Sequence, residues 1–92
     1  MFFVYILQSL RTGRFYVGQT DDLVVRFNQH RQGGVPSTKG YRPWWMPYYE
    51  RFSTRADALR REREIKSKKS AESIRRIIAA GYARMGMPVP GP

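Results

Sequence analysis

Residues 2–19 read FFVYILQSLRTGRFYVGQ, and two apolar stretches within them decide how the fold begins. Residues 2–8 and residues 14–19 are rich in aromatic and β-branched side chains, which favour extended strands. Thr12 and Gly13 lie between the two stretches and suit a tight turn. The chain is therefore predicted to open with a β-hairpin.

A helix is predicted after the hairpin, over about residues 22–32. Thr20 or Asp21 can cap it, because a short oxygen-bearing side chain accepts hydrogen bonds from the free amides of a first helical turn. Gly33–Gly34 ends this helix. Residues 33–43 contain three glycines and two prolines and are predicted to be a loop.

Residues 44–52, WWMPYYERF, predict a third strand, since aromatic side chains favour extended backbone. Pro47 has no amide hydrogen to donate to a neighbouring strand. The strand should therefore lie at an edge of the sheet or contain a bulge.

Two further helices are predicted in the last part of the chain. One begins at Ser53 or Thr54 and continues to about Lys68, and the other is capped by Ser70 and ends at Gly81. The element order ββαβαα predicts an α+β fold, a three-stranded antiparallel or mixed sheet flanked by helices.

Length and composition indicate a single small domain. Ninety-two residues leave little room for a second core, so residues 1–82 are expected to form the domain and residues 83–92, rich in proline and glycine, a flexible tail. No apolar run reaches the length needed to cross a bilayer, which favours a cytoplasmic protein. With no cysteine and one histidine, any metal should be bound by oxygen.

The charge of the chain points to a polyanionic partner. Seventeen Lys and Arg against seven Asp and Glu give a net charge of +10, which suits nucleic acid, a ribosome or a membrane surface. Arginine outnumbers lysine, and its planar guanidinium binds phosphate in two places at once, so nucleic acid is favoured. A source proteome rich in arginine would also explain that ratio.

Two tyrosines in the hairpin are candidate functional residues. If the strands pair Tyr5 and Tyr16 side by side, their phenols meet on one face. The alternative is that both are ordinary core or edge aromatics. Gly18 lies inside the second strand, where glycine often marks the close approach of another backbone or a ligand.

Arg26 and His30 are four residues apart on the first predicted helix and so share one face. Together they could bind and protonate a phosphate. The alternative is a structural histidine beside a solvated arginine.

Glu62 is unusual because Ala58 and Ile65, on the same side of its helix, are apolar. A carboxylate that leans toward the core needs a partner, since burial of an unpaired charge is costly. That partner could be Arg26 or Arg63 in a structural ion pair, or a hard cation such as Mg²⁺.

These residues resemble the signature of the GIY-YIG nuclease family. Phe3-Val4-Tyr5 and Tyr16-Val17-Gly18 are similar to its two halves, with Phe3 in place of the first glycine. VRFNQH (residues 25–30) is similar to the family's helix with an arginine and a histidine, and ALRRE (residues 58–62) to the helix with its metal-binding glutamate. The resemblance covers about residues 2–80 and is greatest to the small stand-alone bacterial members.

The resemblance implies a catalytic set of Tyr5, Tyr16, Arg26, His30 and Glu62. Glu62 would hold one Mg²⁺ or Mn²⁺, Arg26 would stabilise the phosphate, and a tyrosine of lowered pKa, assisted by His30, would be the base. The sequence does not choose between the two phenols.

The function expected from this resemblance is a metal-dependent endonuclease acting on DNA, or on RNA as the second choice, directed by structure or damage with weak sequence preference. The alternatives are a non-catalytic or partner-dependent nucleic-acid-binding module and a basic ribosomal protein. Trp44, Trp45, Tyr48 or Tyr49 could stack on an unpaired base or belong to the core. The residues expected to follow the nucleic-acid backbone are Arg42, Arg55, Arg60, Arg63, Lys66, Lys68 and Lys69.

Overall fold

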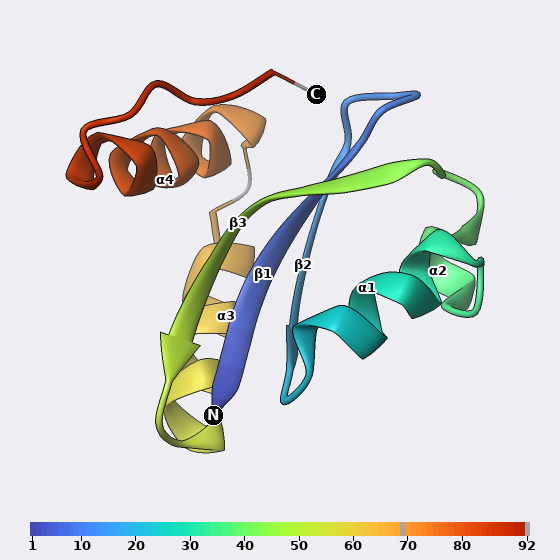
Figure 1. Ribbon diagram of the computed structural model, residues 1–92, viewed down its shortest axis with the longest axis horizontal. Coiled ribbons are helices and arrows are strands. Elements are labelled where there is room, and N and C mark those ends of the chain that lie inside the picture. Colours follow the sequence, from blue (N-terminus) through green and yellow to red (C-terminus); the bar gives the residue numbers. More distant parts are fainter. Residues whose placement is uncertain (69, 92) are drawn as a thin grey trace.

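The predicted hairpin forms two strands of a three-stranded antiparallel sheet in the computed structural model, which describes residues 1–68 and 70–91. The strands are β1 (Phe2–Ser9), β2 (Phe15–Thr20) and β3 (Trp44–Phe52), in the order β2-β1-β3 (Figure 1). The central strand β1 is therefore hydrogen-bonded on both sides. The α+β prediction and the order ββαβαα are confirmed, with one short helix added.

Pro47 meets both expectations for a proline in a strand. β3 is an edge strand, and its pairing with β1 is irregular between Ile6, opposite Tyr48, and Gln8, opposite Trp45. Two residues of β3 therefore face the single residue Leu7, which is a β-bulge. The bulge accommodates the missing amide hydrogen of Pro47.

The three predicted helices are present as α1 (Leu23–Arg31), α3 (Arg55–Lys66) and α4 (Ala71–Arg84). Thr54 and Ser70 cap α3 and α4 as predicted, each accepting a backbone hydrogen bond at 3.2 Å. The cap of α1 is Asp22, which accepts from the Val25 amide at 3.0 Å, rather than Thr20 or Asp21.

The prediction of a plain loop over residues 33–43 is wrong, because a one-turn helix, α2 (Pro36–Lys39), lies within it. Pro36 occupies the first turn of α2, where its fixed φ suits a helix and its missing amide is not needed. One turn is too short to produce a periodic apolar pattern, so periodicity in the sequence does not reveal it.

The helices cover the two faces of the sheet separately. On one face Val4, Ile6 and Val17 pack against Ala58 of α3, with Ile78 of α4 in the same cluster. On the other face a second cluster contains Tyr5, Leu7 and Trp44, with Leu23 and Phe27 of α1. Figure 1 shows α1 and α2 beside β2, and α3 behind the sheet. None of the described helices is long and apolar enough to span a membrane.

The end predicted for the last helix, Gly81, is wrong, because α4 continues to Arg84 and takes in the start of the expected tail. Gly81 serves packing instead. A Cβ atom at this position would lie 2.4 Å from Cε1 of Tyr48, whose ring is buried. The glycine lets α4 approach β3 closely.

Gly81→Ala is expected to destabilise the protein by about 1–3 kcal/mol, because the added methyl group overpacks the contact with Tyr48. Helix propensity alone favours alanine by about 1 kcal/mol, so the substitution would stabilise the protein if propensity dominated. The sign of the change in the free energy of unfolding therefore separates overpacking from propensity. Ala83→Gly, at an exposed position of the same helix, measures the propensity term. Urea unfolding of the three proteins tests this, and a Gly81→Ala variant more stable than the wild type would contradict the packing explanation.

Candidate active site

Four of the five predicted catalytic residues come together on one face of the sheet. The strand register pairs Tyr5 with Gly18 and Leu7 with Tyr16, so the two tyrosines are diagonal neighbours rather than a direct pair. The Tyr5 hydroxyl lies 2.9 Å from Nε2 of His30. The Tyr16 and His30 ring centroids are 5.2 Å apart.

Arg26 completes this group from the first half of α1. Its Nε donates to the Tyr5 hydroxyl at 3.4 Å, and its Nη1 donates to Oε1 of Gln29 at 2.9 Å. The spacing of four residues puts Arg26 and His30 on one face of α1, and both contact the Tyr5 hydroxyl. Arg26 also lines an open groove of ≈ 370 Å³ at the edge of β2, and Arg55 lines the same groove.

Gly18 makes room for the Tyr5 phenol. A Cβ atom at Gly18 would lie 2.4 Å from the Tyr5 hydroxyl oxygen and 2.6 Å from Cζ. The phenol therefore extends across β2 toward the free edge of the sheet. The sequence indicated a close approach at this glycine, and the group that approaches is the Tyr5 side chain.

Thr38 orients His30 in the buried end of the site. The Thr38 hydroxyl donates to the Val35 carbonyl at 3.3 Å, so its oxygen is left to accept a hydrogen bond from Nδ1 of His30 at 2.8 Å. His30 then carries its proton on Nδ1, and the lone pair of Nε2 faces the Tyr5 hydroxyl, which donates. Trp44 fixes Thr38 by donating from Nε1 to its carbonyl at 3.0 Å.

Sequence reasoning missed Thr38. It lies eight positions after His30, a spacing that has no meaning within one element, and its helix α2 was not predicted. The start of α2 at Pro36 was the only local signal available. Only the packing of α2 against α1 brings the hydroxyl to the ring.

Burial controls the protonation of His30 and Tyr5. It lowers the pKa of His30 to about 4, with the positive charge of Arg26 as the second cause. His30 is therefore neutral at neutral pH and fully buried, so the expectation that it protonates a phosphate directly is wrong. Burial also raises the pKa of Tyr5, against the opposing hydrogen bond from Arg26. The lowered tyrosine pKa expected from the resemblance does not hold for Tyr5 in the free protein.

Glu62 approaches the group from the other side of the sheet. It lies on α3, and its carboxylate, 16% exposed, is 3.3 Å from Nζ of Lys66. Its ion-pair partner is therefore neither Arg26 nor Arg63. No hydrogen bond joins Glu62 to the other four residues, but its negative charge is among the causes that raise the pKa of Tyr5.

The described residues contain no cluster of three or more His, Asp or Glu side chains that could hold a metal ion. A metal at this site would have Glu62 as its protein carboxylate. Mg²⁺ commonly binds through one or two carboxylates, several waters and phosphate oxygens. A single oxygen donor in a chain without cysteine fits that chemistry.

The basic residues predicted to bind nucleic acid differ in whether they already form an ion pair with a carboxylate of this chain. Arg55, Arg60 and Lys66 each form an ion pair with a carboxylate of this chain, at 3.8, 2.9 and 3.3 Å. Arg63 and Lys68 are exposed and have no ion pair within the described parts of the chain. α3 therefore offers fewer free cations than the sequence implied.

Arg42 belongs to a separate basic hollow beside α2. It lines this hollow, of ≈ 450 Å³, together with Arg31 and Lys39. Over residues 1–68 and 70–91, none of these three cations takes part in an ion pair. Lys69, the last of the residues predicted to bind nucleic acid, lies outside the described residues.

Comparison with known proteins shows which proteins this chain resembles. A family model described as the GIY-YIG catalytic domain matches residues 1–75. A UPF0213 protein of Staphylococcus aureus strain Mu3 is 37% identical over 76 residues, which cover 82% of this chain and 92% of the relative. The same figures hold for a UPF0213 protein of strain N315.

A solved structure is similar as well. The solution NMR structure of a UPF0213 protein from Bacillus halodurans matches with a TM-score of 0.55 and 29% sequence identity. The match covers 87% of this chain and 85% of that protein.

Thr38→Val is expected to change the tautomer of His30, because valine keeps the shape of threonine but cannot accept the hydrogen bond that Nδ1–H donates. His30 is the only histidine in the chain, so the ¹⁵N signals of its ring are unambiguous. At neutral pH the wild type and Thr38→Ser should show a protonated Nδ1 and a bare Nε2, and Thr38→Val should gain the Nε2-protonated form. A wild type with its proton on Nε2 would contradict the assigned hydrogen-bond direction.

Proposed function

This chain belongs to the GIY-YIG family, a family of nucleases, and on that premise we propose that it is a divalent-metal-dependent endonuclease that hydrolyses phosphodiester bonds in DNA. The observation that carries the proposal is the hydrogen-bonded series Arg26, Tyr5, His30 and Thr38. A series of this kind can accept a proton from an attacking water and stabilise a phosphate at the same end.

In the proposed mechanism Tyr5, which is 1% exposed in the free protein, takes the proton from water once the bound substrate has brought that water to its hydroxyl. As the water oxygen bonds to phosphorus, its proton passes to the Tyr5 oxygen and the Tyr5 proton passes to Nε2 of His30. The bond from phosphorus to the leaving oxygen breaks, and that oxygen takes a proton from solvent. The two transfers must be concerted, because burial disfavours a separated pair of tyrosinate and imidazolium.

The low basicity of His30 in the free protein is compatible with this role. A bound phosphate adds negative charge near Arg26 and His30, and a nearby negative charge raises the pKa of a histidine. The proton is then accepted when the substrate is in place. Thr38 keeps the bare Nε2 atom turned toward Tyr5 throughout.

Arg26 is proposed to bind the phosphate undergoing attack. It is the member of the series that lines an open groove, so a phosphate oxygen can reach it from solvent. Its charge then stabilises the negative charge that develops on the phosphate.

Glu62 is proposed to hold the metal ion, Mg²⁺ or Mn²⁺. When bound, the ion would withdraw charge from the phosphate oxygens. Lys66, the present ion-pair partner of Glu62, has a side chain that is 53% exposed. This flexible ammonium side chain can move aside when a metal ion binds the carboxylate.

The substrate is proposed to be recognised by its structure or by damage, with weak sequence preference, and the protein to act in the cytoplasm. Arg31, Lys39 and Arg42 would hold the backbone through charge alone, which carries no sequence information. The cations of the hairpin turn extend this basic region, since Arg11 donates to the Gly40 carbonyl.

A partner-dependent or non-catalytic nucleic-acid-binding module is the second candidate. The observation that favours it is the position of Glu62, which has Lys66 as its partner and makes no hydrogen bond with the tyrosines. On this alternative, a partner protein or the substrate would have to bring the carboxylate to the phosphate.

Glu62→Gln is expected to abolish cleavage and leave DNA binding nearly intact, because the amide keeps the shape but loses the charge that would hold the metal. The matched control is Glu64→Gln on the same helix, where the carboxylate is exposed and paired with Arg61. The control should cut at the wild-type rate in a single-turnover assay with Mg²⁺ or Mn²⁺. If Glu62→Gln cuts as fast as the wild type, Glu62 does not hold the metal.

DNA binding in EDTA is expected to weaken steeply with salt, and log K should fall linearly with log salt concentration. Lys39→Gln/Arg42→Gln should reduce the slope by about 0.9 for each phosphate that the variant no longer neutralises. Arg60→Gln/Arg76→Gln removes the same charge from ion-paired positions and should change the slope less. Equal slopes for both double variants would show that the hollow beside α2 is not the binding surface.

A further inference from the structure

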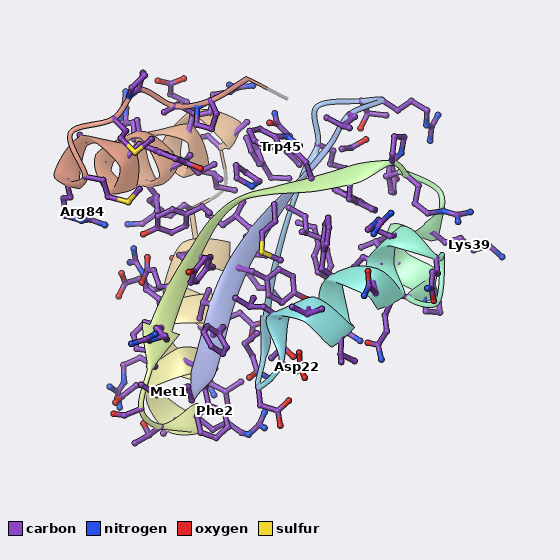
Figure 2. All side chains as sticks on the ribbon, in the orientation of Figure 1. Met1, Phe2, Asp22, Lys39, Trp45 and Arg84 are labelled. Carbon is purple, nitrogen blue, oxygen red and sulfur yellow. The ribbon has the colours of Figure 1, made fainter. Side chains whose placement is uncertain are left out.

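The sheet face that carries Tyr5 is only partly covered by helices. α1 packs over Tyr5 and Leu7 and contacts the first residues of β3. Figure 2 shows α1 and α2 on the side of β2, with the end of β3 farther from them. Toward the start of β1, the strand register pairs Tyr5 with Tyr49 and Phe3 with Arg51. Phe3, Tyr49 and Arg51 therefore lie on the same face as Tyr5. We call these three residues the open platform.

Tyr49 is the exposed aromatic residue of this platform. It is 55% exposed, and no other aromatic residue is among the exposed large hydrophobics of the described chain. The Phe3 ring packs edge-on against it, with centroids 6.0 Å apart and an interplanar angle of 68°. Within residues 1–68 and 70–91 the Tyr49 hydroxyl forms no hydrogen bond. Phe3 thus holds a ring whose other surface is free.

The other aromatic candidates for stacking are occupied. Trp44 and Tyr48 are 5% and 8% exposed and belong to the two cores. Trp45 is partly buried and donates from Nε1 to Gln8 at 3.2 Å. Of the four aromatic residues that the sequence left open, Tyr49 is the one with a free face.

The charges around the open platform suit a nucleotide. Arg51 is exposed and, among the described residues, has no ion pair. The neighbouring carboxylate of Glu50 belongs to the opposite face, where it accepts from Arg61 at 3.0 Å. Arg26 and Arg51 thus flank Tyr5 and Tyr49 with positive charge. A ring surface between two cations matches the base and phosphates of one strand.

We propose that the open platform binds an unpaired nucleobase, stacked on Tyr49, next to the phosphate held by Arg26, with Arg51 on the adjoining phosphate. Tyr49 on β3 and the Tyr5 hydroxyl over Gly18 of β2 lie on either side of β1, and neighbouring strands are about 5 Å apart. The separation of about 10 Å is one that neighbouring nucleotides of one strand can span. A base inside a duplex is already stacked on both sides and cannot use the ring. The substrate class is therefore nucleic acid with a single-stranded segment at the cut, such as a flap, gap or branch. This assignment rests on the proposed nuclease function.

The test compares binding of a single strand, a flapped duplex and a plain duplex of equal length, all in EDTA, with 2-aminopurine at the unpaired position. Tyr49→Ala should weaken binding to the single strand and the flap by about fivefold to a hundredfold and leave duplex binding unchanged. It should also abolish the fluorescence quenching that stacking on Tyr49 produces. Tyr49→Phe keeps the ring and should behave as the wild type.

Met87→Ala is the control for loss of an equally exposed apolar side chain, since Met87 is also 55% exposed. It should leave all three affinities unchanged. Thermal unfolding of each variant establishes that the fold is intact, which the exposure of Tyr49 leads us to expect.

Three outcomes would contradict the proposal that the open platform binds an unpaired base. Tyr49→Ala could leave all affinities unchanged, could weaken single-strand and duplex binding equally, or could convert a wild-type dimer to a monomer in sedimentation. The last would make this face a contact between two copies of the chain.

The nuclease proposal fails separately. A wild type that binds unpaired DNA through Tyr49 but never cuts it with any divalent metal would support base stacking on the open platform and contradict the nuclease proposal. A wild type that cuts, and whose Tyr49→Ala variant binds and cuts equally well, would support the nuclease proposal and contradict base stacking on Tyr49.

Discussion

The position of the Tyr5 phenol is the constraint on which the rest of the site depends. It lies across Gly18, where any other residue would place a Cβ atom 2.4 Å from the hydroxyl oxygen. From there the hydroxyl contacts both Nε2 of His30 and Nε of Arg26. One missing methyl group in β2 thus lets a tyrosine of β1 reach a helix that follows β2. Close packing leaves no alternative place for the ring, so its geometry is set before any ligand binds.

Burial determines the protonation state of His30, on which the direction of its hydrogen bonds depends. A buried histidine must be neutral or paired with a negative charge, and burial and the charge of Arg26 lower the pKa of His30 and keep it neutral. Its hydrogen-bond partners are the uncharged hydroxyls of Tyr5 and Thr38. Two hydroxyl partners leave one ring nitrogen as donor and the other as acceptor, so the ring has a defined direction. The proposed proton transfer uses that direction. The arrangement also explains why α2, only one turn long, is part of the site.

Charge and exposure divide the surface in a way that complements the site. The carboxylates of α3 and α4 neutralise cations such as Arg60, Arg75 and Arg76. The stretch from residue 23 to residue 49 contains no Asp or Glu, so Arg31 and Lys39 have no acidic neighbour along the chain. A polyanion would therefore be drawn to the side of the molecule that carries α1 and α2. Net charge alone could not have located that side.

The sequence by itself determined the strands, three of the helices and the family, because these follow from local patterns: apolar stretches, capping residues and fixed spacings such as that of Arg26 and His30. It could not determine that Thr38 contacts His30, that Gly81 faces Tyr48, or that Lys66 is the ion-pair partner of Glu62 among several nearby cations. It also could not give the direction of the Tyr5 pKa, which depends on how deeply the phenol is buried. Contacts between segments distant in sequence, and the desolvation they cause, exist only once the helices have packed on the sheet, and for that reason only the tertiary structure decided them.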